Sequence, residues 1–163
     1  MTKILVAYFS ATGTTARVAH ALAEAAGADL YAITPAVPYT AADLNWHDRK
    51  SRSSLEMADA ASRPAIAGEL PEVAAYDAVF VGFPIWWYQA PRIIETFIQA
   101  RDFSGKTLIP FATSGGSPLG ESGALLEKLC PGGRWLAGRR LNAGVTEREL
   151  RDWLKQLGLG EGR

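Results

Sequence analysis

Residues 3–15, which read KILVAYFSATGTT, join two patterns that belong to different kinds of secondary structure. The first part, residues 4–9, is a short apolar run rich in strand-forming residues, which predicts a buried β-strand. The second part, residues 10–15, contains only small and hydroxyl residues, and residues 16–26 then predict a helix. A strand that ends in such a turn and opens a helix directs backbone N–H groups at one spot. The helix dipole makes that spot favourable for an anion such as a phosphate.

This turn differs from the two best-known phosphate-binding motifs. A Walker A loop needs a lysine before its serine or threonine, and the turn has none. The dinucleotide fingerprint needs three glycines, whereas Gly13 stands alone. Considered by itself, the turn fits a phosphate site and an ordinary helix N-terminus capped by Thr12 or Thr14 about equally well. Because no lysine or arginine lies within it, we expect the charge of a bound phosphate to stay largely uncompensated.

The composition indicates one ordinary globular domain, which we place at residues 1–160. The chain has 163 residues, 48% of them hydrophobic, which is enough for a substantial core. Its 17 basic and 17 acidic residues balance, which argues against a general nucleic-acid binder or a protein that binds anionic membranes. No apolar run approaches the ~18 residues of a membrane span. We therefore expect a cytoplasmic protein, without an intrachain disulfide because Cys130 is the single cysteine.

Strand and helix patterns alternate along the chain and predict a parallel sheet. Helical patterns separate the further strands, which we expect at residues 29–33, 76–83, 107–113 and 135–141. Such alternation is typical of an α/β fold with right-handed crossovers. Five strands suggest a doubly wound five-stranded parallel sheet of order 2-1-3-4-5, which binds ligands outside the carboxyl ends of strands 1 and 3. Residues 34–70 fit this pattern poorly, because they form a long polar segment without clear periodicity.

Three loops are expected to meet at that edge of the sheet, and the first is the turn at residues 10–15. The second, residues 84–88 (PIWWY), has three successive aromatics that cannot all face inward, so we expect at least one exposed stacking platform. The third, residues 113–117 (TSGGS), has two glycines that let the backbone approach a flat ligand. Taken singly, the aromatics also fit a cover over the first helix or an oligomer contact, and the glycines fit a plain turn. Together the loops fit a phosphorylated flat heteroaromatic ligand, and FMN fits best.

At these loops the sequence resembles the flavodoxin family. Residues 10–15 (SATGTT) are similar to the family's phosphate loop, [ST]-x-T-G-x-T, and residues 84–88 and 114–117 resemble its two isoalloxazine loops. Residues 38–46 (PYTAADLNW), 51–57 (SRSSLEM) and 62–66 (SRPAI) resemble a flavodoxin-like subgroup with an elaborated segment after strand 2. The resemblance implies FMN as the cofactor, bound by Ser10, Thr12, Gly13, Thr14, Thr15, Pro84, Ile85, Trp86, Trp87, Thr113, Ser114, Gly115 and Gly116.

The resemblance implies a redox protein that carries electrons between a reductase and an acceptor. Electron-carrier flavodoxins are typically strongly acidic, whereas this chain is neutral, so long-range steering toward a basic partner would be weak. The alternative is an NAD(P)H-dependent FMN oxidoreductase that acts on quinones or similar small acceptors, although no pyridine-nucleotide motif is visible. The partner is accordingly a redox protein or a small-molecule acceptor. Residues 34–70 could build a substrate pocket or the contact of a homodimer.

The remaining reactive side chains give no catalytic or metal site. Two histidines and one cysteine offer no metal cluster. Cys130 stands in a C-x3-R pattern after a predicted helix, which does not match a C-x5-R phosphatase loop, so we expect a buried structural thiol. Asp77 lies at the wrong end of its strand for the acceptor of a receiver domain. Ser114 lacks the G-x-S-x-G context of a nucleophile.

Overall fold

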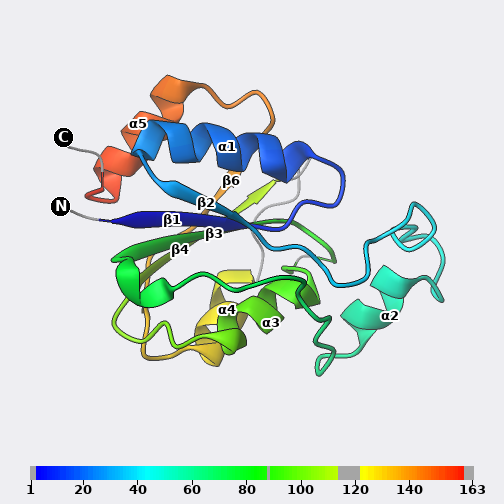
Figure 1. The fold of residues 1–163 in the computed structure, drawn as a ribbon. Coiled ribbons are helices and arrows are strands. Elements are labelled where there is room, and N and C mark those ends of the chain that lie inside the picture. The colour runs from blue at the N-terminus through cyan, green and yellow to red at the C-terminus, as the bar shows by residue number, and fades with distance from the viewer. Residues whose placement is uncertain (1–2, 88, 114–121, 160–163) are drawn as a thin grey trace.

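The computed structural model describes residues 3–87, 89–113 and 122–159. Strands and helices alternate along the chain, as the sequence predicts (Figure 1). The elements are β1 (Ile4–Tyr8), α1 (Thr14–Ala26), β2 (Asp29–Ala32), α2 (Arg52–Ala58), a 3-10 helix (Val73–Ala75), β3 (Ala78–Pro84), α3 (Arg92–Ala100), β4 (Thr107–Thr113), α4 (Ser122–Leu129), β5 (Arg134–Trp135), β6 (Arg139–Leu141) and α5 (Glu147–Gln156). None of the helices in these ranges combines the length and the hydrophobicity that a membrane span requires.

The strands pair in parallel in the order β2-β1-β3-β4-β5, which confirms the predicted order 2-1-3-4-5. The predicted fifth strand, residues 135–141, is instead divided into two. Its first part, β5, pairs with the beginning of β4, and its second part, β6, pairs with the last three residues of β4. Between them the chain leaves the ladder after the Leu136 N–H bonds the Leu108 carbonyl at 2.9 Å. The carboxyl end of β4 therefore has β6 as its neighbour.

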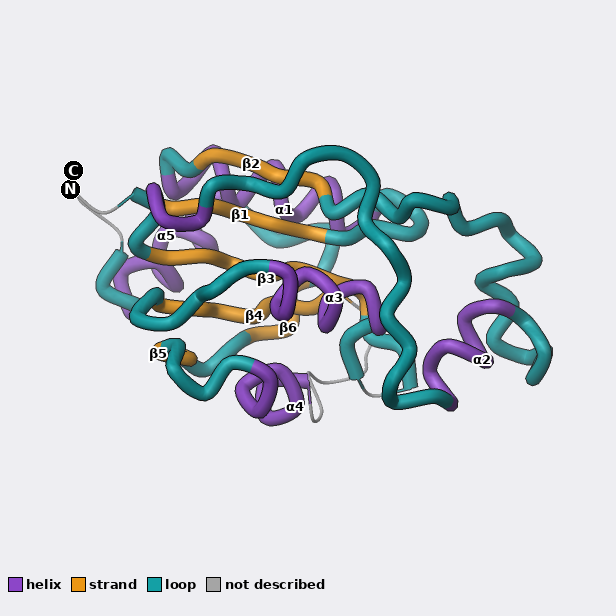
Figure 2. The backbone as a smooth tube through the Cα atoms, turned by 60° about the horizontal axis from the view of Figure 1, so that its bottom comes forward, coloured by secondary structure: helices purple, strands orange, loops and turns teal. Residues whose placement is uncertain are grey.

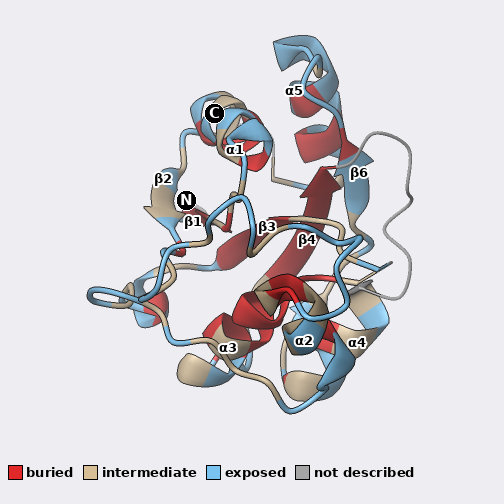
Figure 3. Ribbon diagram, turned by 90° about the vertical axis from the view of Figure 1, so that its right-hand side faces the viewer, coloured by how far each residue is buried: buried red, intermediate tan, exposed pale blue. Residues whose placement is uncertain are grey.

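Helices cover both faces of the sheet, α1 and α5 on one and α3 and α4 on the other (Figure 2). Because successive strand residues point to opposite faces, Val6 and Phe80 pack under α1 and α5, whereas Leu5 and Val79 pack against α3. The central strands β3 and β4 are buried almost throughout (Figure 3). Because helices cover both faces, both sets of side chains are buried, and the sequences of these strands are therefore continuous apolar runs.

The segment at residues 34–70 contains the single helix α2 and projects beyond the carboxyl edge of the sheet (Figures 1 and 2). Two buried charged residues of α3 hold it there. The Arg92 guanidinium donates to the carbonyl of Met57 at 2.8 Å and bonds the carboxylate of Glu95 at 3.3 Å. The same Glu95 carboxylate accepts from Arg63 at 3.0 Å. The segment is thus joined to the body of the protein at both α2 and Arg63.

Candidate functional site

The N-terminus of α1 opens at the carboxyl edge of the sheet. Gly13 is the N-cap residue, with φ 101°, and the helix has no side-chain cap and no acidic residue in its first turn. The Gly13 N–H bonds the Ser10 hydroxyl at 3.0 Å, and the first bond back along the helix runs from the Arg17 N–H to the Gly13 carbonyl at 3.1 Å. Among the described residues, the N–H groups of residues 14–16 therefore have no acceptor. Capping by Thr12 or Thr14 is not observed, and the helix end is open to an anion.

Two threonine hydroxyls join this helix end to the end of β4. Thr15 Oγ1 and Thr113 Oγ1 lie 2.6 Å apart, and the two residues are 1% and 4% exposed. The helix begins at Thr14, two residues earlier than predicted, so Thr15 sits in its first turn with its side chain directed inward. Both members of the pair were expected from the sequence at the site, and the structure brings them into contact.

A cleft of about 740 Å³ lies over this pair. It combines the first predicted loop with the beginning of the second and third loops and with the end of β6. Its lining residues are Ala11, Thr12, Thr14, Thr15, Pro84, Ile85, Thr113, Arg140, Asn142 and Ala143. The structure thus brings the first loop, the start of the second and Thr113 together at one edge of the sheet, whereas the rest of the third loop lies outside the described residues.

Arg140 is a lining residue that the sequence patterns do not single out. It lies on β6 opposite Ala112, next to Thr113. Its neighbour Arg139 points the other way, where its guanidinium lies over the Trp153 ring at 5.4 Å and bonds Gln156 at 3.1 Å. Arg140 therefore provides a cation in the cleft although the turn at residues 10–15 contains none. The expectation that a bound phosphate would stay largely uncompensated considered only the turn, and it stays a prediction.

The aromatic loop after β3 divides its tryptophans between two environments. Trp86 is half-buried and packs edge-on against Phe9 and Tyr39, with ring centroids 5.8 and 5.5 Å away. The backbones of Trp86 and Gln89 exchange hydrogen bonds of 2.9 and 3.1 Å, so the chain turns tightly between them. In that turn Trp87 is exposed and has φ 51°. Trp87 is thus an exposed aromatic of the kind expected, and Trp86 supports the loop from within.

Neither tryptophan lines the cleft, so a role for Trp86 or Trp87 in cofactor binding stays a prediction. Four other residues expected to contribute from these loops or beside them, Tyr88, Ser114, Gly115 and Gly116, lie outside the described residues. The described part of the site therefore consists of the helix end, the threonine pair, the Pro84–Ile85 backbone and Arg140.

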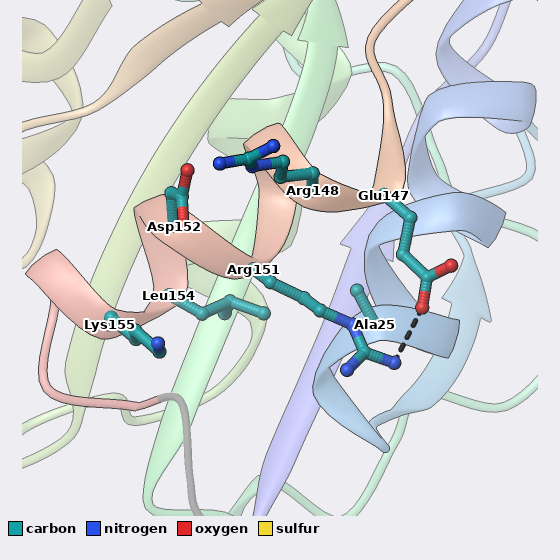
Figure 4. A pocket seen from close by; sticks show the side chains of 7 residues that line it. All are labelled: Ala25, Glu147, Arg148, Arg151, Asp152, Leu154 and Lys155. Carbon is teal, nitrogen blue, oxygen red and sulfur yellow. Dashed lines mark ion pairs between the residues drawn. The ribbon is translucent and has the colours of Figure 1, made fainter.

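Another hollow, of about 560 Å³, lies between α1 and α5 at the opposite end of the sheet (Figure 4). Its walls carry mostly charged side chains of the exposed α5 surface. Arg151 forms an ion pair with Glu147 there, and Ala25 belongs to the last turn of α1. Because α1 runs antiparallel to the strands, this hollow is remote from the carboxyl edge and from every loop considered above.

The positions of Cys130 and Asp77 agree with the sequence analysis. Cys130 is buried, as expected of a structural thiol. In the part of the chain that the structure describes, no group of histidine, cysteine and carboxylate side chains could hold a metal ion. Asp77 lies at the amino end of β3, where its carboxylate accepts from the Lys3 N–H at 2.8 Å.

Comparison with known proteins decides the family. A model of the flavodoxin family matches residues 3–157, which is nearly the whole chain. The chain belongs to the flavodoxin family. Among solved flavodoxin-like structures, a proposed flavoprotein from Bacteroides eggerthii DSM 20697 is 52% identical, with a TM-score of 0.93 over 98% of this chain and 100% of that chain. A second one, from Bacteroides uniformis ATCC 8492, is 55% identical, with a TM-score of 0.90 over 94% and 98% of the two chains.

A more distant structure shares the flavodoxin-like fold. It is the flavoprotein from Lactobacillus acidophilus NCFM in complex with FMN, which is 18% identical, with a TM-score of 0.69 over 86% of this chain and 93% of that chain. No curated protein is significantly similar to this chain.

Proposed function

We propose that this protein binds FMN in the cleft at the N-terminus of α1 and passes electrons between a reductase and an acceptor. The observation that carries the proposal is the convergence of three anion-binding features in that cleft. They are the free N–H groups of residues 14–16, the Thr15–Thr113 hydroxyl pair and the Arg140 guanidinium. Membership of the flavodoxin family and the FMN complex of the Lactobacillus acidophilus flavoprotein support the choice of cofactor.

The described residues fit the phosphate end of FMN. A phosphate placed at the start of α1 receives hydrogen bonds from the backbone N–H groups of the first turn and favourable charge from the helix dipole. The exposed hydroxyls of Thr12 and Thr14 provide further donors. Charge-assisted hydrogen bonds of this kind contribute ~1.5–3 kcal/mol each. Arg140, which also lines the cleft, adds a positive charge.

The threonine pair supplies a directed donor. In a hydrogen bond between two hydroxyls one donates and the other accepts, and the accepting hydroxyl keeps its own O–H for a third group. Because both residues are buried, that O–H has few alternatives to a ligand in the cleft. Pro84 and Ile85 form the apolar wall along which the rest of the ligand extends toward the aromatic loop. When bound, FMN supplies the redox chemistry itself, which the protein tunes.

A second candidate function is an NAD(P)H-dependent FMN oxidoreductase that acts on small acceptors such as quinones. Two observations favour it over a carrier of electrons between proteins. The chain is neutral, with 17 basic and 17 acidic residues, and therefore steers a charged protein partner weakly. In addition, the exposed Trp46 and Trp87 lie around a second hollow at the same edge of the sheet.

Anaerobic addition of NADPH to the FMN-loaded protein separates the two candidates. A carrier keeps its bound flavin oxidised, as seen in the visible absorption, until a separate flavodoxin reductase is added. In an oxidoreductase, the absorbance of the bound flavin bleaches with NADPH alone and recovers when a quinone is supplied. If neither NADPH nor NADPH with a reductase reduces the bound flavin, both candidate functions are wrong.

A further inference from the structure

A second hollow, of about 630 Å³, lies beside the aromatic loop at the carboxyl edge of the sheet. One wall is the projecting segment, which contributes Trp46, His47, Arg49 and Met57. The other wall is Trp87. The loop that carries Trp87 begins with Pro84 and Ile85, which line the cleft proposed for FMN. The two cavities are therefore neighbours along one loop, but they have no lining residue in common.

The two tryptophans of this hollow are unusually exposed for their size. Trp46 is 65% exposed and Trp87 is 42% exposed. Trp87 is also the only non-glycine residue with positive φ in the described ranges 3–87, 89–113 and 122–159. Holding a bulky residue in that conformation costs ~1–2 kcal/mol. Such strain, combined with a large apolar ring left in water, is typical of a position that serves binding rather than stability.

Partly buried polar contacts hold together the elements behind the hollow. Tyr39 donates to the Glu56 carboxylate at 2.6 Å, and Glu56 is paired with Arg52 at 2.9 Å. Burial, and then the hydrogen bond to Glu56, raises the pKa of Tyr39 far above its ordinary value, so the hydroxyl stays a donor. The Tyr39 ring packs against Trp86, the residue before Trp87. One cluster thus supports both α2, which contributes Met57 to the hollow, and the loop that carries Trp87.

The charge of the hollow favours an anionic ligand. Arg49 lies on its wall, and His47 stacks on Trp46 with ring centroids 3.7 Å apart. No acidic residue is among the described residues that line it. Two indole rings line the hollow, and they favour a planar aromatic body, because aromatic stacking adds ~0.5–1.5 kcal/mol beyond the burial of area.

We infer that this hollow binds a planar aromatic small molecule that carries negative charge, between Trp46 and Trp87. Two sources share this chemistry: a quinone with an acidic substituent, and a nicotinamide nucleotide. Electron exchange between this ligand and the flavin rests on the proposed function, whereas binding of the ligand does not. The nearness of the two cavities along one loop is what makes this exchange feasible.

The test is calorimetric titration of the FMN-saturated protein with two probes, anthraquinone-2-sulfonate and NADP⁺. We expect at least one probe to bind with one-to-one stoichiometry, and the tighter probe identifies the source. Trp46→Ala should lower the affinity for that probe by about threefold to tenfold. Arg49→Gln should lower it by about twofold to fivefold. The matched controls Leu55→Ala and Lys50→Gln change exposed residues of the same segment outside the hollow and should leave affinity unchanged.

Several results would overturn the inference. The first is that neither probe binds, and the second is that Trp46→Ala leaves the affinity unchanged. The third is that cyclohexanesulfonate, which is anionic but not aromatic, binds as tightly as the probe. A probe that binds the apoprotein but is displaced by FMN shows that the flavin itself occupies the hollow, which also overturns it. The proposed function is judged separately by FMN titration of the same apoprotein. If FMN does not bind but a probe still binds in a Trp46-dependent way, the proposed function fails and the inference survives.

Discussion

The hydroxyl oxygens of Thr15 and Thr113 lie 2.6 Å apart and are buried beneath the cleft. One belongs to the first turn of α1 and the other is the last residue of β4, so the contact links the helix end that follows β1 to the carboxyl end of β4. It sets the position of the helix end relative to the beginning of the glycine-containing loop. A change in either hydroxyl should therefore affect ligand binding, and because it leaves the other buried hydroxyl unpaired, it should also lower stability.

We predict that Thr15→Val weakens FMN binding by about tenfold, which corresponds to one lost hydrogen bond to a charged group of ~1.4 kcal/mol. Valine keeps the shape of the side chain but removes the hydroxyl. Quenching of flavin fluorescence in a titration measures the dissociation constant. Thr107→Val, at the opposite end of β4, is the matched control and should bind FMN normally. Unchanged affinity in Thr15→Val would contradict the assignment of this pair to the site.

Arg140→Gln should weaken FMN binding by about fivefold, because an exposed charge contributes up to ~1 kcal/mol. Riboflavin, which lacks the phosphate, should bind the variant and the wild type equally. The dependence of FMN affinity on salt should also become weaker in the variant. Arg139→Gln is the control, since its side chain points toward Trp153 and Gln156. An equal loss for FMN and riboflavin would show that Arg140 does not act on the phosphate.

Gly13→Ala should reduce both stability and FMN affinity. A Cβ at Gly13 meets no atom within 4 Å, so the cost comes from its φ of 101° and is ~1–2 kcal/mol. Relief of that strain moves the N–H groups of the first turn, to which we assign the phosphate. Gly27→Ala, at the other end of α1 with φ 64° and equally open space, should lower stability without changing FMN affinity. Thermal melts and FMN titrations of both variants distinguish the two effects.

Tyr39→Phe should lower the free energy of unfolding by ~1 kcal/mol, the contribution of an ordinary hydrogen bond. The lost bond is the one from the Tyr39 hydroxyl to the Glu56 carboxylate, whereas the ring contacts with Phe9 and Trp86 remain. Chemical denaturation measures the change. Because the ring still supports the aromatic loop, FMN affinity should change little, and a large loss of FMN affinity would mean that the hydroxyl itself contributes to the site.

The capping box of α5 should make stability depend on pH. Hydrogen bonds from the Thr146 backbone and side chain lower the pKa of Glu149 from its ordinary value of 4.5. A lowered folded-state pKa adds stability that is complete above the unfolded value and is lost as pH falls through the folded value. The difference in melting temperature between wild type and Glu149→Gln should thus be largest near neutral pH and shrink in acid. The exposed Glu24→Gln serves as control, and a constant difference for Glu149→Gln would contradict the linkage.

Much of the fold could be predicted because its signals are local. The buried run at residues 4–8 and the hydroxyl-rich turn after it are adjacent in sequence, and the capping box at Thr146 and Glu149 is likewise local. The division of the last strand was not predictable, because β5 and β6 are too short for their pattern to separate. Each needs only its own part of β4 as a partner.

Arg140, the cleft residue that the sequence analysis did not name, could not be predicted for a different reason. Arg140 follows another arginine on a short, largely exposed strand, and nothing local distinguishes the two. Only the pairing of β6 with the end of β4 places Arg140 beside Thr113. Similarly, the apolar stripe of α3 does not reveal that Arg92 and Glu95 are buried, because their partners lie in the segment at residues 34–70.

The central claim is that the cleft at the start of α1 holds the phosphate of FMN. Its most direct test is a fluorescence titration of FMN and of riboflavin with the purified apoprotein under the same conditions. We predict saturable one-to-one quenching of FMN, with much weaker binding of riboflavin, since riboflavin cannot engage the N–H groups of residues 14–16 or Arg140. Equal affinity for the two flavins, or no quenching of FMN, would contradict the account.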